Sequence, residues 1–557
     1  MSEANIEVIQ KDKSYSIKNG LIIGALTTLP LIGLFYLGDQ VGGLSFVPFD
    51  IFDWMARILP GNVITLGIDG IVTVIDILNL GSTSTSAKLI EQLIALFLFG
   101  AAGAVLGGAT AWLLKRGLSR FKAGGLVGAI AFLFVVIVEI ILPLGNSSLF
   151  ALIWIGILLI GWGIVNGYLN QAINGFEQSG DKQGRRRVLI GTAGGALTLL
   201  LTGVGLGKLF GSQETANDAS EILANGNPAG TPTAQAEAYP GSATLESSTN
   251  GPDILVTRTR DDVDPAPGTR SELTSNEDFY RIDINTRQPS INQEEWQLEV
   301  VGLFDKPRGL SLQELRSFPS ETQPITLSCI SNRVGGDLIG TSNWTGLRLM
   351  DLLEELGIQP EAKELMVDSA DGFFESVIRE DMMDPRTLLV YAMNGEPLPK
   401  GHGFPLRIYI PNRYGMKQPK WIKQITAVGE SVLGYWVVRG WSQEARPQIV
   451  SVIDSIAADE PSANGQIPVG GIAWAGDRGI QKVELQIDDG DWMEATLRTP
   501  PLSQLTWVQW RYDWSPLSGK HEFRVRATDG DGALQIKKKS GVRPDGATGY
   551  HSKEVRI

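Results

Sequence analysis

Long apolar runs fill the first 210 residues of the chain, whereas apolar and polar positions alternate over short stretches in the remainder. Five of the runs contain about 20 mostly apolar residues, the length at which an α-helix crosses the hydrocarbon core of a membrane. Their many Gly and Ala residues are typical of helices that pack closely in lipid. The pattern predicts an N-terminal all-α bundle of about five spanning helices rather than the buried helices of a soluble core. These helices are expected at 19–38, 89–114, 124–144, 148–169 and 188–210.

A sixth apolar run, at 61–80, is interrupted by Asp69 and Asp76. A carboxylate at the centre of a bilayer is costly, so this run makes a poor spanning helix. Together with the aromatic stretch that begins at Phe46, it is expected to form an interfacial or re-entrant segment on the outer side of the membrane.

Basic residues indicate which helix ends face the cytoplasm. Lys and Arg cluster near the N-terminus and in two short loops, at 115–122 and 182–187. Cytoplasmic loops carry such an excess of Lys and Arg. The chain reaches the first loop after an even number of crossings only if the run at 61–80 does not span. Five crossings then place everything after residue 210 outside the cytoplasm.

The last apolar run is preceded by paired arginines, in 184–189 (GRRRVL). This arrangement resembles a twin-arginine export signal, which sends folded, cofactor-loaded proteins across a membrane. An ordinary basic anchor fits the same residues. Both interpretations send the C-terminal part outward.

The anchor domain at 1–210 is followed by a linker and two predicted folded domains. Residues 211–253 are rich in Gly, Ser, Thr, Asn, Ala and Pro and lack a periodic apolar pattern, which predicts a flexible tether. Short strands and amphipathic helices then alternate over 254–444, as in an α+β domain. The strands are expected at 296–301 and 326–329, and the helices at 310–317 and 347–356.

Residues 445–557 show a strand-rich pattern with frequent turns. Turn signals such as DDGD at 488–491 and DGDG at 529–532 separate the predicted strands. Strands at this spacing over about 110 residues suggest an immunoglobulin-like β-sandwich. The strands are expected at 469–475, 482–487, 507–514 and 521–527.

Composition narrows the range of functions. The chain has 48 basic and 61 acidic residues, a formal net charge of -13, whereas proteins that bind nucleic acid carry a basic face. It contains one Cys and three His. One Cys forms no intramolecular disulfide, and the chain lacks the ligands for a Cys₄ zinc site or an iron–sulfur cluster. The predicted membrane helices contain neither His nor Cys, which excludes a bis-histidine haem there.

The single cysteine, Cys329, lies between a predicted strand and a polar, Gly-rich turn. A lone cysteine is often a small buried hydrophobe. An unpaired thiol outside the cytoplasm is, however, a liability unless it has a use. Because a thiolate is a soft ligand, Cys329 is a candidate for the one protein ligand of a metal held mainly by an organic dithiolene.

Several motifs of the soluble half resemble, in order, those of the molybdopterin-binding domain of the sulfite oxidase family. They are 275–281 (SNEDFYR), 326–332 (TLSCISN), 343–349 (NWTGLRL), 391–399 (YAMNGEPLP), 401–407 (GHGFPLR), 411–417 (PNRYGMK) and 419–422 (PKWI). Residues 447–557, with 545–551 (DGATGYH) near their end, resemble the family's C-terminal dimerisation domain. The resemblance does not reach the membrane half.

The resemblance implies a molybdenum–molybdopterin cofactor, with Cys329 as the thiolate on molybdenum. A pterin phosphate needs hydrogen-bond donors and positive charge, which basic residues at matching positions would supply. The matching positions are Arg407, Lys417 and Lys420 for the phosphate, His402 and Ser369 for further pterin contacts, and Tyr280 and Arg281 for the cofactor or the substrate pocket.

The choice of substrate depends on two positions. Arg281 matches the anion-binding arginine of sulfite-oxidising members, and a guanidinium fork suits an oxyanion; the alternative is a surface salt bridge. Sulfite oxidases place a tyrosine shortly after the Lys-Trp motif, where this chain has Leu433, with Tyr435 and Trp436 close behind. Sulfite oxidation is therefore favoured, with reduction of S-oxides or N-oxides on the same metal site as the alternative.

The expected protein is a multi-pass enzyme of the cell membrane that performs two-electron oxygen-atom transfer with its catalytic domains outside the cytoplasm. Its expected partners are a small oxyanion or oxide substrate and an external electron carrier such as a cytochrome or a quinone, and a homodimer stays open. Two other classes also stay open. One is a non-catalytic receptor or assembly protein that kept the fold. The other is a transporter, whose acidic candidates are Asp69, Asp76, Glu91 and Glu139.

Overall fold

The computed structural model describes residues 15–78, 80–142, 148–224 and 263–557, with only the backbone of residues 76 and 210–224. Contacts divide the chain into two compact units. The first consists of Met1–Leu59 and Lys88–Ala234, and the second of Pro60–Ala87 and Gln235–Ile557. The segment between the first and second predicted spanning helices is thus divided between the two units.

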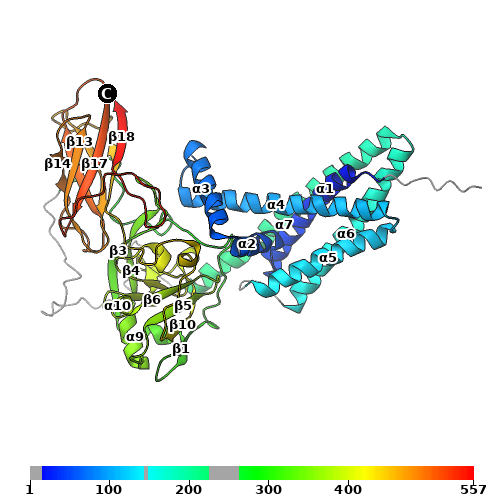
Figure 1. The fold of residues 1–557 in the computed structure, drawn as a ribbon, viewed down its shortest axis with the longest axis horizontal. Coiled ribbons are helices and arrows are strands. Elements are labelled where there is room, and N and C mark those ends of the chain that lie inside the picture. The colour runs from blue at the N-terminus through cyan, green and yellow to red at the C-terminus, as the bar shows by residue number, and fades with distance from the viewer. Residues whose placement is uncertain (1–14, 79, 143–147, 225–262) are drawn as a thin grey trace, which may run out of the picture. The chain divides into compact units, whose positions relative to one another are not determined.

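The first unit is built from helices (Figure 1). Among the described residues, five helices are long and apolar enough to cross a membrane, and each overlaps one of the five predicted runs. The helices that contribute to this unit are α1 (Ile17–Gly42), α2 (Val47–Ile58), α4 (Thr83–Lys115), α5 (Arg120–Ile141), α6 (Leu149–Gln178) and α7 (Lys182–Ala224). The run at 61–80 forms a separate helix, α3 (Gly61–Leu78), which is not among the five.

The last helix differs from its predicted bounds at both ends. α7 begins at Lys182, because the Asp181 side chain accepts a hydrogen bond from the N–H of Gly184 at 2.8 Å and caps it. It continues to Ala224, so the first part of the predicted tether at 211–253 is helical. The rest of that tether lies outside the described residues, as does the expected start of the next domain at 254.

Glycines set the close approach of the helices in the first unit. A Cβ added to Gly124 of α5 would overlap the main-chain oxygen of Gly163 on α6. The same holds for Gly24 of α1 against Gly103 of α4. In lipid the hydrophobic effect does not drive helices together, because the lipid tails are as apolar as the helix side chains. Close van der Waals contacts between backbones stabilise the helix pairs instead.

Most of the acidic candidates for a transport path have structural partners. Glu139 of α5 is buried and accepts a hydrogen bond from Ser45 at 2.7 Å. Glu91 pairs with Lys88 at 2.6 Å, and Asp69 pairs with Arg543 at 2.6 Å. The side chain of Asp76 lies outside the described set. Each of the three described carboxylates thus has a partner within the protein, which does not favour a transport path.

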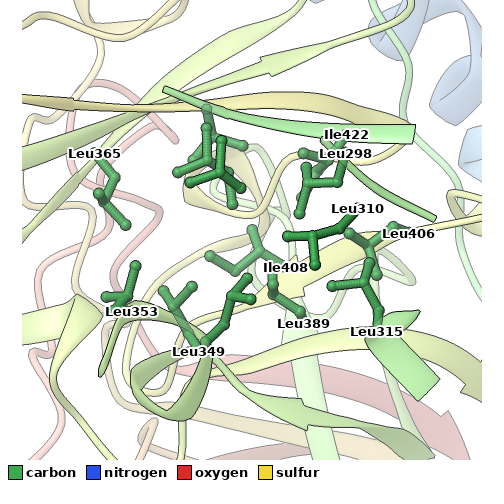
Figure 2. Close-up of a cluster of buried hydrophobic side chains, with 14 of the residues drawn as sticks. Leu298, Leu310, Leu315, Leu349, Leu353, Leu365, Leu389, Leu406, Ile408 and Ile422 are labelled. Atoms are coloured by element: carbon green, nitrogen blue, oxygen red, sulfur yellow. The ribbon is translucent and has the colours of Figure 1, made fainter. Parts of the chain in front are cut away.

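The second unit contains two sheets that share a core (Figures 1 and 2). One is mixed, because β1 runs parallel to β10 while the other pairs are antiparallel. Its order is β2 (Arg308–Ser311), β1 (Gln297–Gly302), β10 (Ile422–Val428), β5 (Glu364–Ser369) and β6 (Phe374–Ile378). The other contains β3 (Ser320–Ser328), β4 (Ile339–Arg348), β7 (Leu388–Met393) and β8 (Glu396–Pro397), with β9 (Arg407–Tyr409) also on β7.

Leucine and isoleucine side chains fill this core (Figure 2). Leu298 of β1, Leu365 of β5 and Leu389 of β7 are fully buried. The predicted helix at 310–317 is shorter than expected: β2 runs to Ser311, which caps the five-residue helix α8 (Leu312–Arg316). Ser311 forms a capping box with Glu314, and this fixes the start of the helix. Helices α9 (Leu349–Leu356) and α10 (Arg379–Met382) complete this part.

The C-terminal residues form two four-stranded sheets around a second core. One sheet has the order β11 (Val450–Ile456), β12 (Ile467–Trp474), β16 (Val508–Trp514) and β15 (Thr496–Leu497). The other has the order β14 (Met493–Glu494), β13 (Ile480–Ile487), β17 (Lys520–Asp529) and β18 (His551–Arg556). Along β17, buried positions alternate with more exposed ones, so one face of its sheet packs inward.

The C-terminal sheets are joined to the strand that leads to Cys329. The N–H of Trp507 donates to the Thr326 hydroxyl at 2.8 Å, and the N–H of Thr326 donates to the Leu505 carbonyl at 3.1 Å. Both parts accordingly belong to one compact unit.

Candidate functional site

Cys329 is the first residue after β3, at the start of the loop that leads to β4. Its side chain is buried, and its N–H donates to the Leu338 carbonyl at 2.9 Å. Its Sγ lies 3.0 Å from the Ser331 hydroxyl. Burial raises the pKa of the thiol, and the hydrogen bond from Ser331 opposes that rise only in part. The thiol is thus protonated until a cation stabilises the thiolate.

The hydroxyl of Tyr280 lies near the end of β3, next to Cys329 in the chain. A Cβ added to Gly415 would sit 3.1 Å from the Tyr280 hydroxyl and 3.5 Å from the Ser328 carbonyl oxygen. Burial raises the pKa of Tyr280 well above its usual value; the charge of Cys329 raises it further and Arg407 lowers it. Tyr280 therefore couples the candidate metal ligand electrostatically to a buried cation.

That cation, Arg407, begins β9 and is 5% exposed. Its Nη1 donates to the His402 carbonyl oxygen at 3.0 Å, and its guanidinium lies 4.7 Å from the centre of the Trp344 ring. Burial lowers the pKa of Arg407 to about 10, while Tyr280 and Asp283 oppose this. The group stays charged at neutral pH, so a buried positive charge is held within the site.

Lys420 supplies a second positive charge near Arg407. It pairs with the buried carboxylate of Asp283, and its Nζ donates to the Gly401 carbonyl at 3.1 Å. Burial lowers the pKa of Lys420, Asp283 raises it, and Arg407 lowers it. A Cβ added to Gly403 would lie 3.1 Å from the Cβ atoms of both Arg407 and Lys420, so this glycine permits the two cations to approach.

His402 and Arg281 flank the two cations. The His402 ring nitrogen Nε2 lies 3.0 Å from the Asn276 carbonyl oxygen. Burial and the charges of Arg407, Lys420 and Arg281 lower the pKa of His402 to about 4, so its imidazole is neutral at physiological pH. Arg281 pairs with Asp283 at 3.4 Å and keeps 40% of its side chain exposed.

Ser369 ends β5 and is fully buried. In the part of the chain that the structure describes, its hydroxyl oxygen has no hydrogen-bond partner. The turn that follows Ser369 contacts the segment that carries Lys420, because the N–H of Ala370 donates to the carbonyl of Trp421, the next residue after Lys420, at 2.8 Å. A buried hydroxyl without a partner is unfavourable, and a polar ligand would satisfy it.

Lys417 is placed differently from the other basic residues. Its ammonium group donates to Glu375 at 2.6 Å, and both side chains are buried. Burial raises the pKa of Glu375 and the charge of Lys417 lowers it. The lysine that sequence reasoning assigned to the pterin phosphate thus already has a buried counter-ion.

Two residues of the site escaped the sequence analysis. Asp283 holds Lys420 and Arg281 together, and it follows Arg281 by two positions, the spacing of neighbours on one face of an extended segment. Arg333, four residues after Cys329, lines the small pocket beside the thiol together with Tyr414. Burial raises the pKa of Tyr414 to about 12, so it stays neutral there.

The residues present fit a phosphorylated pterin that carries a metal. Among the described residues, the donor set contains one thiol, the buried guanidinium of Arg407, the partly buried ammonium of Lys420, a neutral imidazole and a hydroxyl without a hydrogen-bond partner. Thiolate suits a soft metal, and clustered cations with a hydroxyl suit a phosphate.

Comparisons with known proteins agree with this chemistry. Residues 285–436 match the family model described as the oxidoreductase molybdopterin binding domain. The mitochondrial sulfite oxidase of Drosophila melanogaster is 27% identical over 355 residues, which cover 53% of this chain and 61% of that protein. The uncharacterized oxidoreductase YuiH of Bacillus subtilis is 32% identical over 152 residues, which cover 27% of this chain and 75% of YuiH.

A third relative has a different activity in its name. The inducible NADH nitrate reductase 2 of Glycine max is 28% identical over 306 residues, which cover 43% of this chain and 34% of that protein. The chain thus spans about three fifths of the Drosophila sulfite oxidase and a third of the nitrate reductase. By its matched domain and these relatives, the chain belongs to the sulfite oxidase family of molybdopterin-binding oxidoreductases, whose cofactor is molybdenum–molybdopterin.

Proposed function

We propose that this protein is a membrane-anchored molybdenum enzyme that catalyses two-electron oxygen-atom transfer outside the cytoplasm, with sulfite as its favoured substrate. The observation that carries the proposal is that the Tyr280 hydroxyl lies by the end of β3, which leads to Cys329, because an added Gly415 Cβ would be close to both that hydroxyl and the Ser328 carbonyl oxygen. The charges of Cys329 and of the buried Arg407 both act on the pKa of Tyr280. A metal ligand and an anion-binding cation thereby share one buried site. Because the chain keeps both the candidate metal ligand Cys329 and the buried Arg407, a receptor or assembly protein that kept only the fold is disfavoured.

The cofactor-holding roles follow from the donor set. Cys329 would lose its proton and bind molybdenum. Arg407 and Lys420 would neutralise the pterin phosphate, while Ser369 and His402 would meet its polar groups. When bound, the molybdenum centre supplies the change of two electrons and the exchange of the oxygen atom. The side chains of this chain contribute position and charge.

Arg281 is the proposed substrate-binding residue. Asp283 holds its guanidinium in place, and a Cβ added to Gly401 would lie 3.0 Å from its Nη1. Because part of the side chain is exposed, an oxyanion can reach it, and a guanidinium fork binds an oxyanion through two parallel hydrogen bonds.

One position supports a second candidate reaction. Leu433 stands where the sulfite-oxidising pattern has a tyrosine, and 47% of its side chain is exposed. The Tyr435 that follows is buried, and its N–H donates to the Phe374 carbonyl at 2.9 Å. Reduction of an S-oxide or N-oxide is therefore the alternative that this departure favours.

The helical unit supports the proposed membrane location. Five helices long and apolar enough to cross, with Lys and Arg near the N-terminus and in the loops at 115–122 and 182–187, favour an outward-facing C-terminal half. A phosphatase reporter fused after residue 224 should be active, and a cytoplasmic reporter there silent. The opposite pattern would overturn the sidedness and leave the catalytic proposal intact.

The proposed partners are an external electron carrier and a second copy of this chain. The absence of His and Cys from the helical half favours an external electron carrier, a cytochrome or a quinone, over a haem within the anchor. The two packed sheets at 450–556 support an immunoglobulin-like domain through which two chains would form a homodimer.

A pair of assays tests the reaction. The full-length enzyme, loaded with cofactor, is incubated with sulfite and an oxidised dye, and in parallel with an S-oxide or an N-oxide and a reduced dye. Sulfite-dependent reduction of the dye is the expected result. Turnover of the oxides alone would replace sulfite oxidation by the alternative. No turnover in either assay, with molybdenum bound, would contradict oxygen-atom transfer to or from these substrates.

A further inference from the structure

The segment Pro60–Ala87, which contains helix α3, contacts the rest of the second unit at three separate points. Gly61 lies against Arg439: an added Cβ would sit 3.0 Å from the Arg439 carbonyl oxygen. Asp69 accepts a hydrogen bond from Arg543 at 2.6 Å. Beyond the helix, the N–H of Thr83 donates to Asp337 at 2.8 Å. Pro60–Ala87 therefore belongs to the second unit, although it lies between helices of the first unit in sequence.

This segment forms part of a cavity of about 740 Å³. Asp69 lines it together with the basic residues Arg333, Lys539 and Arg543. Arg333 also lines the small pocket beside Cys329, and Val334 and Ala547 are likewise shared by the two. The cavity thus adjoins the pocket of the metal ligand.

The charged side chains that line the cavity determine how it attracts an anion. The whole chain has a net charge of -13, which repels an anion at long range. Three basic side chains line the cavity, and one of them, Arg543, pairs with Asp69. The Asp69 side chain is 51% exposed and that of Arg543 is 26% exposed, so solvent screens the pair and it is weak.

We propose that Asp69 of α3 is an internal counter-ion for Arg543, and that an anionic substrate displaces this carboxylate when it enters the cavity on its way to Cys329. The inference rests on the proposed oxyanion chemistry of the site. It gives the Pro60–Ala87 segment a role in substrate affinity. Asp69 acts through Arg543 and is a positioning residue, not a catalytic one.

The proposal predicts that removal of the carboxylate tightens anion binding. Sulfate serves as the probe, because it is the dianionic product of sulfite oxidation and is not oxidised further. Asp69→Asn in the full-length protein should lower the Kd for sulfate about two- to five-fold, the range expected for a screened ion pair. The gain should shrink as ionic strength rises.

A double-mutant cycle makes the test specific. Arg543→Gln should weaken sulfate binding, and Asp69→Asn added to that variant should have no further effect, because the cation it would release is gone. Asp489→Asn, which removes the same charge from a side chain that is 99% exposed, is the matched control and should leave the Kd unchanged. Asp69→Ser provides a second replacement of the carboxylate.

Binding is measured by the rise of the unfolding temperature with sulfate at constant ionic strength, and independently by the inhibition constant of sulfate against dye-linked turnover. An unchanged sulfate Kd in both Asp69 variants would overturn the proposal. So would an equal gain in the Arg543→Gln background or in Asp489→Asn. If the enzyme does not oxidise sulfite but the cycle in the thermal measurement holds, the proposed substrate fails and the counter-ion role of Asp69 stands.

Discussion

The main-chain N–H of Ile453 donates a hydrogen bond to Nδ1 of His551 at 3.0 Å. A ring nitrogen that accepts a hydrogen bond carries no proton, so this bond requires the neutral imidazole. His551 also packs against Gly335 in the loop that follows Cys329, where an added Cβ would overlap the ring. The bond links β11 to β18, and the packing of the His551 ring on Gly335 connects both strands to the loop of the proposed metal ligand.

This relationship predicts how stability depends on pH. Burial, and then the charges of Lys553, Arg270 and Lys539, lower the pKa of His551 to about 4 from its usual 6.5. Between these two values the unfolded chain binds more protons than the folded chain. The stabilisation is therefore complete above pH 6.5 and is lost as the pH falls toward 4, in total about 2–3 kcal/mol.

Urea unfolding of the wild type and of His551→Gln at pH 7 and pH 4.5 checks this. The variant should lose less stability between the two pH values than the wild type does. His521→Gln is the control, because the Asp488 carboxylate raises the pKa of His521 and gives it the opposite dependence. An identical loss in the wild type and in His551→Gln would contradict the neutral, buried imidazole.

The buried pair of Lys417 and Glu375 gives a second prediction. Lys417→Met leaves a buried carboxylate without its counter-ion and should destabilise the fold by about 3–5 kcal/mol. The double variant Lys417→Met with Glu375→Met should recover most of this loss. If Lys417 also holds the pterin phosphate, the double variant will fold but will lose pterin, measured by the fluorescence of the extracted cofactor. Full pterin content would assign Lys417 a purely structural role.

Arg281 should determine affinity for the anionic substrate. Arg281→Gln is expected to raise KM for sulfite about 10- to 100-fold, the amount that a charge-assisted hydrogen bond contributes. A neutral S-oxide substrate should be affected less, and Arg281→Lys should fall between the two. Equal effects on charged and neutral substrates would point to disruption of Asp283 and Lys420 instead of loss of an anion contact.

Cys329→Ser should abolish turnover while the chain stays folded. The side chain is small and buried, so its replacement should change stability by no more than a typical single substitution, about 0.5–3 kcal/mol. Dye-linked activity and the unfolding temperature are measured on the same preparation. Ser331→Ala is the matched control, because it removes only the hydrogen bond to Sγ. Retained activity in Cys329→Ser would refute its role as metal ligand.

The length of the continuous apolar runs was sufficient to locate the long helices, and each strand that the sequence predicts overlaps an observed one. Along strands such as β17, buried positions alternate with more exposed ones, which is the pattern that predicts a strand. Helix ends were less accurate, because they depend on single caps. Asp181 starts α7 before the apolar run begins, and Ser311 delays α8 until β2 has ended.

The site was predictable only where residues stand within a motif. Cys329, Arg407 and Lys420 lie in recognisable stretches, whereas their partners come from distant parts of the chain. Asp283 is 137 residues from Lys420, and Asp69 is 474 residues from Arg543. No local pattern encodes such pairs, because they exist only once the fold brings the segments together.

The most direct test of the account is the molybdenum and pterin content of the full-length protein, purified from cells that make the cofactor. Metal analysis by mass spectrometry and fluorescence of the oxidised pterin should give about one molybdenum and one pterin per chain, the stoichiometry that a single thiolate ligand implies. A folded chain that carries neither molybdenum nor pterin under these conditions would contradict the central claim that Cys329 and its neighbouring cations hold a molybdenum cofactor.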